Sequence, residues 1–194
     1  MAEKKTTDRR TLKTRRALCD ALAELLTDHE LHKVTVQQIA DKADVNRVTF
    51  YKHYLDVYDL YDKIESECLV DFGMLMLELE QQPDSEIFSN LVGYISEHRK
   101  IFRMIYSPNA TGQLRSKLSK LLEGVFLKIQ SEKHGLTITD QRLSYLCCYH
   151  AQGCLSVISR WVLNDFQEPE DFIIRSLTAL DSHMQTLFES AKNA

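Results

Sequence analysis

The 194-residue chain is 44% hydrophobic and 27% charged, contains only six Gly and three Pro, and carries a formal net charge of −4. This composition predicts a compact, mostly helical protein and excludes a chain that is disordered beyond its ends. No apolar run has the length of a bilayer-spanning helix, and the first ten residues lack the apolar core of a secretory signal, so we expect a cytoplasmic protein.

The charges are unevenly distributed along the chain. Residues 1–54 carry eleven Lys and Arg against eight Asp and Glu, whereas residues 55–194 carry thirteen against twenty. A basic front on an acidic body can bind phosphates locally while the body is repelled from DNA. The negative net charge therefore does not exclude a nucleic-acid-binding protein.

The first predicted helix runs from about Asp8, a possible N-cap, to Asp28, with leucines recurring at helical spacing. Basic residues gather at its start, where they oppose the helix dipole. They are Arg9, Arg10, Lys13, Arg15 and Arg16. This cluster has two interpretations: a solvated helix face, or a surface beside a phosphate backbone.

Two short helices and a tight turn are predicted between Val34 and Tyr54. Thr35 and Gln38 have the spacing of a capping box, which begins one helix, and Asn46 can cap a second helix from Arg47 to about Tyr54. Three residues separate the two helices, which is the spacing of a helix-turn-helix.

The second of these helices carries side chains suited to a major groove. Arg47 can donate two hydrogen bonds to guanine, while Val48 and Thr49 offer methyl contacts to thymine. Tyr51, Lys52 and His53 can reach phosphates. Phe50 and Tyr54, four residues apart, can anchor the helix inward.

The rest of the chain is also predicted to be helical. We expect a long helix that Asp56 caps and Pro83 stops, followed by helices over about 86–97, to near 106, about 113–134, 140–164 and 169–191. The fold class is thus all-α, with about nine helices and no strand. We expect a helix-turn-helix DNA-binding domain over 1–55, and a helical ligand-binding and dimerisation domain over 56–194 joined to it by the long fourth helix.

Residues 10–65 resemble the DNA-binding domain of the TetR/AcrR family of one-component transcriptional regulators. The matching positions are Thr35, Val36, Ile39, Ala40, Ala43, Val45, Thr49, Phe50, Tyr51, His53, Tyr54, Asp59 and Leu60. The resemblance implies a homodimer on a palindromic DNA operator and a small-molecule effector that releases it. By position, Thr35, Gln37, Thr49, Lys52 and His53 would touch phosphates or nearby edges, and Arg47, Val48 and Tyr51 would face bases.

Three positions depart from the family pattern. Asp44 replaces the usual turn glycine, Glu30 replaces the glycine that ends the first helix, and Val57 replaces a lysine that often clamps phosphate. The first two changes demand helix-end geometry that Asp tolerates better than Glu. The third removes a phosphate contact, so DNA affinity should depend more on the basic N-terminal residues.

One later helix carries a cluster of cysteine and histidine. Cys147, His150 and Cys154 share one helix face and are a possible zinc-ligand set. The alternative is that the cysteines are small packing residues and His150 makes a core hydrogen bond, because no fourth ligand is evident. Five cysteines in no framework spacing also favour reduced thiols over disulfides.

An effector cavity, if present, is expected among the fourth to eighth helices. Its candidate lining residues, each of which can instead be plain core, are Phe72, Met76, Tyr94, Phe102, Tyr106, Phe126, Tyr145 and Trp161. The last two helices are expected to form a four-helix dimer interface. Its candidate residues are Leu146, Gly153, Val157, Leu177, Leu180, Met184 and Leu187.

Three functions follow from these features. The first is a dimeric, ligand-responsive repressor, and the second is a coactivator whose acidic body binds a partner protein. The third, a zinc-responsive regulator, would use Cys147, His150 and Cys154. No catalytic triad spacing, glycine-rich phosphate loop or HExxH motif occurs, so we do not expect an enzyme.

Overall fold

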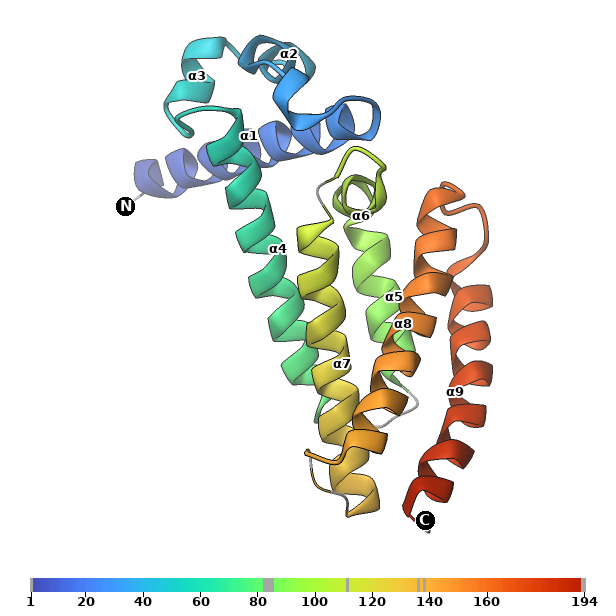
Figure 1. The fold of residues 1–194 in the computed structure, drawn as a ribbon. Coiled ribbons are helices and arrows are strands. Elements are labelled where there is room, and N and C mark those ends of the chain that lie inside the picture. Colours follow the sequence, from blue (N-terminus) through green and yellow to red (C-terminus); the bar gives the residue numbers. More distant parts are fainter. Residues whose placement is uncertain (1, 82–85, 111, 136, 138, 193–194) are drawn as a thin grey trace. The chain divides into compact units, whose positions relative to one another are not determined.

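The computed structural model describes residues 2–81, 86–110, 112–135, 137 and 139–192. Over these residues the chain forms nine α-helices, one short 3-10 helix and no strand (Figure 1), which confirms the predicted all-α class. The elements are α1 (Ala2–Asp28), η1 (Leu31–Lys33), α2 (Val36–Lys42), α3 (Arg47–Tyr51), α4 (Val57–Leu79), α5 (Ile87–Glu97), α6 (Arg99–Tyr106), α7 (Gln113–His134), α8 (Gln141–Leu163) and α9 (Glu170–Lys192). None of the helices in these described ranges combines the length and apolar character needed to cross a membrane.

Helix α1 begins at Ala2, six residues before the predicted start at Asp8. The segment before Asp8 includes Ala, Glu and Lys, which are strong helix formers, so the helix extends toward the N-terminus. Helix α4 starts where expected, because the Asp56 carboxylate accepts a hydrogen bond from the Asp59 amide at 2.9 Å. Pro83, which was expected to stop α4, lies outside the described residues.

The chain divides into two compact units, and each is continuous in space but not in sequence. The first unit comprises Met1–Cys68 and Lys100–Gly112, so it holds α1 to α3, the first half of α4 and most of α6. Its core is built from large side chains that are fully buried, among them Leu18, Leu22, Ile39, Phe50 and Leu60. Burial of each such side chain stabilises the fold by roughly 1.5–3 kcal/mol.

Helix α6 belongs to the first unit because polar contacts attach it to the second half of α1. The Lys100 ammonium pairs with Glu24 at 2.8 Å and with Asp20 at 3.2 Å. At the other end of α6, the buried Ser107 hydroxyl donates to the Leu26 carbonyl at 3.0 Å. The Leu26 carbonyl lies in the last turn of α1, where no intrahelical amide is available to it. A boundary placed from sequence at residue 55 does not capture this return of the chain.

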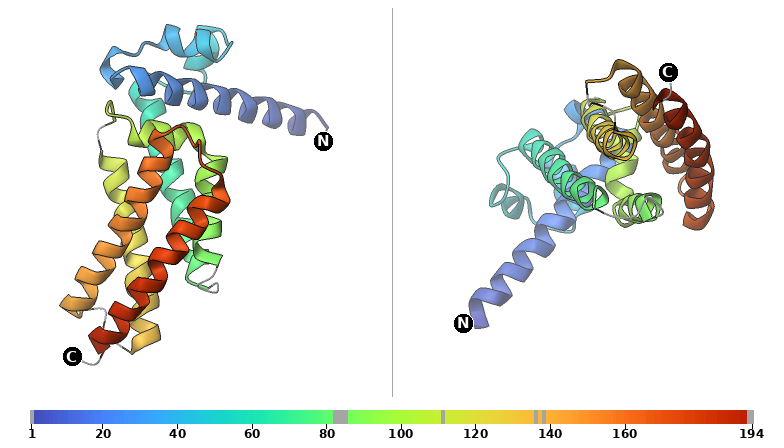
Figure 2. Two further views of the ribbon diagram at one scale, coloured as in Figure 1. Left: turned by 90° about the vertical axis from the view of Figure 1, so that its right-hand side faces the viewer. Right: turned by 90° about the horizontal axis from the view of Figure 1, so that it is seen from below.

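The second unit comprises Leu69–Arg99 and Gln113–Ala194. Helix α8 packs against α7 and α9, and α5 also packs against α9 (Figure 2). The α8–α9 turn closes with Asp165 in the left-handed region at φ 57°. There the Phe166 amide donates to the Trp161 carbonyl at 2.9 Å, and the two rings meet edge to face at 4.8 Å. This is the Schellman arrangement, with its usual apolar contact across the helix end.

The Ser107 contact gives a test of the link between α6 and α1. We expect Ser107→Ala to lower the free energy of unfolding of the first unit by about 1–2 kcal/mol, because it removes the Leu26 bond and leaves a buried carbonyl unpaired. Ser182→Ala is the control, since that hydroxyl is exposed and bonds only within its own helix. It should change stability by less than about 0.5 kcal/mol. Equal effects in urea unfolding would contradict the role given to Ser107.

Candidate nucleic-acid interface

The first helix of the predicted motif starts as the sequence indicates. The Gln38 amide donates to the Thr35 hydroxyl at 3.3 Å, and the Thr35 amide donates to the Gln38 side-chain oxygen at 2.8 Å. This reciprocal pair is a capping box, which satisfies two backbone donors that the helix leaves unpaired. The predicted cap is confirmed, and it sets the direction in which α2 leaves η1.

The turn after α2 is closed by backbone hydrogen bonds around Asp44. The Val45 amide donates to the Ala40 carbonyl at 3.0 Å, and the Asp44 amide donates to the Asp41 carbonyl at 3.2 Å. Asp44 itself has φ 53°, which is the left-handed geometry expected where the family has glycine. The expectation for Glu30 is wrong, since that residue has φ −67° and ψ 145°, an extended conformation open to any side chain.

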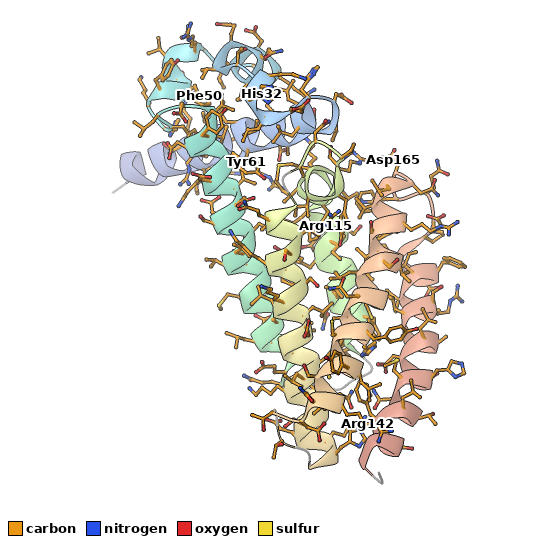
Figure 3. All side chains as sticks on the ribbon, viewed as in Figure 1. His32, Phe50, Tyr61, Arg115, Arg142 and Asp165 are labelled. Carbon is orange, nitrogen blue, oxygen red and sulfur yellow. The ribbon has the colours of Figure 1, made fainter. Side chains whose placement is uncertain are left out.

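Helix α3 starts as predicted but ends three residues early. The Asn46 side chain accepts a hydrogen bond from the Val48 amide at 2.8 Å, which confirms the N-cap. The helix then stops at Tyr51 instead of Tyr54, because the following amides of Lys52 and His53 bond three residues back rather than four. Tyr54 nevertheless joins Phe50, labelled in Figure 3, in the core, and the centroids of the two rings are 5.7 Å apart.

The predicted base-reading residues lie together on the outer face of α3. Arg47, Val48 and Tyr51 are exposed, with Val48 at 64% and Tyr51 at 49%. Arg47 donates to the Tyr51 hydroxyl at 3.1 Å, and its guanidinium lies 5.5 Å from the ring centroid. The two side chains therefore lie against each other on the exposed face of α3.

The predicted phosphate contacts surround this face. Thr35, Gln37 and Lys52 are exposed, whereas Thr49 and His53 are half-buried. The Thr35 hydroxyl is engaged in the α2 cap, and the Gln37 amide donates to Asp41 at 2.7 Å. Both side chains are therefore held in fixed positions at the start of α2.

The basic residues of α1 differ in whether they are exposed or paired within the chain. Arg9, Arg10, Lys13 and Arg16 are exposed, and the first, third and fourth of these lie at the i, i+4, i+7 spacing of one helix face. Arg15 instead pairs with Glu67 at 2.8 Å and donates to the Tyr54 hydroxyl at 3.4 Å. Burial raises the pKa of Tyr54 to about 12, so this hydroxyl stays neutral. Arg15 thus stabilises the first unit and is not presented outward.

The start of α4 differs from what the family pattern would supply. Val57, in the place of the usual lysine, is buried and cannot reach a phosphate. Leu55 and Tyr58 beside it are 81% and 53% exposed, although neither is among the residues predicted to contact DNA. Their exposure could have been predicted from the sequence, because both positions lie off the stripe of Val57, Leu60 and Tyr61 that faces the core.

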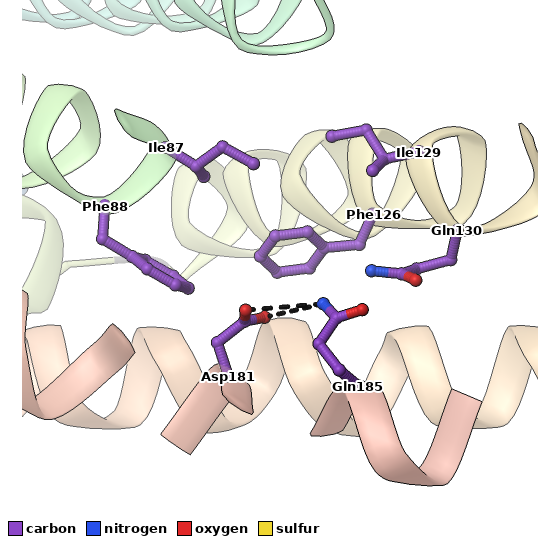
Figure 4. Close-up of a pocket in the computed structure, with 7 residues that line it drawn as sticks. All are labelled: Ile87, Phe88, Phe126, Ile129, Gln130, Asp181 and Gln185. Carbon is purple, nitrogen blue, oxygen red and sulfur yellow. Dashed lines mark hydrogen bonds between the residues drawn. The ribbon is translucent and has the colours of Figure 1, made fainter. Parts of the chain in front are cut away.

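The predicted effector-lining residues are divided between the two units of the chain. Phe72, Met76, Phe126 and Trp161 are buried in the second unit, and Tyr94 is half-buried there. Phe102 and Tyr106 are buried in the first unit, and Tyr145 is 74% exposed. Of these residues only Phe126 lines the small pocket of the second unit (Figure 4). Most of the expected lining is therefore core or surface.

The proposed zinc ligands on α8 are not arranged as a metal site. The part of the chain that the structure describes contains no group of three or more His, Cys, Asp or Glu placed to hold a metal. Burial raises the pKa of the Cys147 and Cys154 thiols to about 12. His150 stacks on Phe126 with ring centroids 4.2 Å apart. These side chains are packing residues of the second unit, and all five cysteines are free thiols.

Comparison with known proteins agrees with this geometry. The family model described as "Bacterial regulatory proteins, tetR family" matches residues 18–62, and the one described as "Transcriptional regulator C-terminal region" matches residues 85–181. The second match alone spans half of the chain. The chain belongs to the TetR family of transcriptional regulators. It is accordingly a DNA-binding regulator and not an enzyme.

Solved structures of TetR-family and other regulators share the fold. A candidate fatty acid metabolism regulator from Clostridium perfringens aligns with a TM-score of 0.65 and 20% identity, covering 84% of this chain and 94% of its own. The fatty acid degradation regulator FadR from Bacillus halodurans aligns with a TM-score of 0.64 and 15% identity, and the match covers 90% of this chain and 94% of FadR. FadR from Bacillus subtilis, in complex with stearoyl-CoA, aligns with a TM-score of 0.61 and 17% identity. That match covers 85% of this chain and 96% of the FadR chain. No curated protein matches the sequence.

Asp44 gives a test of the turn in this TetR-family regulator. We expect Asp44→Gly to raise the free energy of unfolding by about 0.5–1 kcal/mol, because glycine adopts a positive φ without steric cost. Asp44→Val should lower it by about 1–2 kcal/mol. Asp62→Gly, at an exposed site inside α4, is the control and should be destabilising by about 1 kcal/mol. If glycine destabilises both positions in thermal unfolding, Asp44 is not strained.

Proposed function

We propose that this protein is a dimeric repressor that binds a palindromic operator through α3 and leaves it when a small-molecule effector binds the second unit. The observation that carries the DNA-binding role is the outer face of α3, where Arg47, Val48 and Tyr51 are exposed on a helix capped at Asn46. Such a face suits direct reading of base edges in a major groove. A regulator of this kind acts in the cytoplasm, where bacterial DNA lies.

The side chains of this interface divide by chemistry. Arg47 can contact guanine with two donors, and Val48 can pack on a thymine methyl group. Thr35, Gln37, Thr49, Lys52 and His53 would contact the backbone and fix the register. Because Val57 offers no charge, the exposed cations of α1 supply further electrostatic attraction.

Substitutions on α3 test this assignment on a DNA fragment selected from random sequences by the wild-type protein. We expect Arg47→Ala to weaken binding by about 1–3 kcal/mol for each half-site and to relax base preference at one position. Lys52→Ala should weaken binding to selected and random DNA alike, and lower the slope of log K against log salt by about one. Arg175→Ala is the control, because this exposed cation lies on α9 and pairs with Asp171.

Filter binding across a salt series measures these effects. Unchanged affinity in both Arg47→Ala and Tyr51→Ala would show that α3 does not read the DNA. A loss of affinity in Arg175→Ala as large as that in Lys52→Ala would show a general charge effect instead.

The exposed apolar side chains of α8 and α9 support the proposed dimer. Tyr145 and Tyr149 on α8, and Leu180 and Leu187 on α9, are all about half exposed or more. Gly153 lies on the exposed side of α8, and a Cβ built there meets no atom within 4 Å. Exposed large apolar residues beside a small residue suit close helix packing with a second copy. Leu177 and Met184, also expected at this interface, are wrong candidates, because both are buried inside their own chain.

A charge placed on this surface tests the dimer. We expect Leu180→Glu to raise the dimer dissociation constant at least about ten-fold, since a carboxylate would be desolvated between the two copies. Val70→Glu is the matched control, because Val70 is an exposed apolar residue on α4. Sedimentation velocity at micromolar concentrations distinguishes the outcomes. A wild-type monomer, or equal effects of the two substitutions, would refute this interface.

A second candidate function is a coactivator whose second unit binds a partner protein. The favouring observation is an exposed apolar stripe on α4, formed by Val70, Met74 and Leu77 at i, i+4 and i+7. The dihydroxyacetone kinase operon activator DhaS shares the fold with a TM-score of 0.51 and 20% identity. Recovery of a stoichiometric protein partner that Met74→Glu abolishes would favour this function over small-molecule release.

A further inference from the structure

The pocket of the second unit lies among α5, α7 and α9 (Figure 4). Four of its lining residues are apolar, namely Ile87, Phe88, Phe126 and Ile129, and three are polar, namely Gln130, Asp181 and Gln185. The space open to the centre of a water-sized sphere is ≈ 10 Å³, about enough for one small polar group. The chemistry of this space is set by Asp181, the one charged residue of the lining.

The Asp181 carboxylate is poorly satisfied for a group set against apolar surfaces. Its side chain is 21% exposed, and its two oxygens share the Gln185 amide at 3.4 Å each. Figure 4 shows the carboxylate directed toward the side of the pocket where Phe88 and Phe126 lie. A carboxylate in such surroundings needs strong donors or a cation to offset its lost hydration.

Behind the carboxylate lies His150, whose side chain is only 4% exposed. Its Nε2 is 3.2 Å from an Asp181 oxygen. The direction of approach is nevertheless unsuitable, and neither ring nitrogen has a hydrogen-bond partner among the described residues. The ring is held instead by Phe126, stacked at 4.2 Å, and by Phe88 at 6.5 Å. Buried polar atoms without partners are rare in native proteins and often mark a site for a ligand or ion.

We propose that this pocket is the effector site and that it receives the ammonium group of an organic cation. An ammonium has three donors, which suit the Asp181 oxygens. The neighbouring phenyl rings add attraction between a cation and an aromatic face. A ligand with an anionic head would instead place like charges together. The site thus differs from one built for a carboxylate. Its regulatory meaning rests on the proposed function.

Two basic side chains contact the amide groups that line the pocket. Lys133 lies at the rim, where it is exposed and donates to the Gln185 oxygen at 3.1 Å. The His134 Nε2 lies 3.1 Å from the side-chain oxygen of Gln130. In both contacts the side-chain oxygen of the glutamine, Gln185 or Gln130, is already engaged. The Asp181 carboxylate is therefore the acceptor that remains for a ligand in the pocket. Removal of that one carboxylate should therefore abolish the preference for a cation.

Three probes with the same tail test the proposal by calorimetry on the full chain without DNA: hexylammonium, hexanol and hexanoate. We expect hexylammonium to bind at least about ten-fold more tightly than hexanol, because the head groups differ in charge, and hexanoate to bind most weakly. Asp181→Asn should reduce hexylammonium affinity to the level of hexanol. Asp171→Asn is the matched control, since this exposed α9 carboxylate lies outside the pocket and pairs with Arg175. It should leave the affinity within about two-fold.

Several outcomes would overturn the proposal. These are the absence of saturable hexylammonium binding, hexanoate binding as tightly as hexylammonium, or full hexylammonium affinity in a folded Asp181→Asn variant. The comparison of head groups on the wild-type protein decides the matter even if that variant does not fold. Binding of the cation without release of DNA would refute the assignment of this pocket as the effector site but leave the cation site itself intact, so the two failures are distinguishable.

Discussion

The turn between α2 and α3 is the constraint on which the reading surface depends. Within four residues, Ala43 to Asn46, the chain ends one helix, passes through the left-handed region at Asp44 and caps the next helix. Each cap contributes about 1 kcal/mol, and the burial of Phe50 fixes the rotation of α3 about its own axis. The direction of Arg47, Val48 and Tyr51 follows from these local devices. No contact with DNA is needed to create it.

The chain passes between its two units at three places. These crossings are within α4 after Cys68, between Arg99 and Lys100, and after Gly112. At the second crossing, adjacent residues are held by different units. Arg99 donates to Ser96 at 2.9 Å and lies 4.8 Å from the Phe166 ring, whereas Lys100 pairs with Asp20 and Glu24 of α1.

The features that the sequence predicted well are those set by residues three or four apart. The capping box at Thr35, the cap at Asn46 and the left-handed Asp44 each depend on neighbours in the chain. The error at Glu30 is local, whereas the other errors concern contacts that distant segments decide. Glu30 is extended because η1 follows it, and Leu177, Met184 and Tyr145 share helical spacing with both core and surface positions. Periodicity identifies a helix face but does not say what covers it.

The pairing of His150 with Asp181 shows how a non-local contact can nevertheless follow from local signals. The turn between α8 and α9 centres on Asp165 and Phe166, which a Schellman cap closes. His150 precedes Asp165 by fifteen residues, and Asp181 follows Phe166 by fifteen. In two antiparallel helices of equal rise, residues equidistant from the turn lie side by side. The spacing of the cysteines on α8 predicts thiol ligands for a metal, whereas the symmetry of the hairpin predicts that His150 lies beside Asp181 on α9. A polar residue on one helix of a hairpin is therefore best compared with its mirror position across the turn before a metal site is inferred from its own helix.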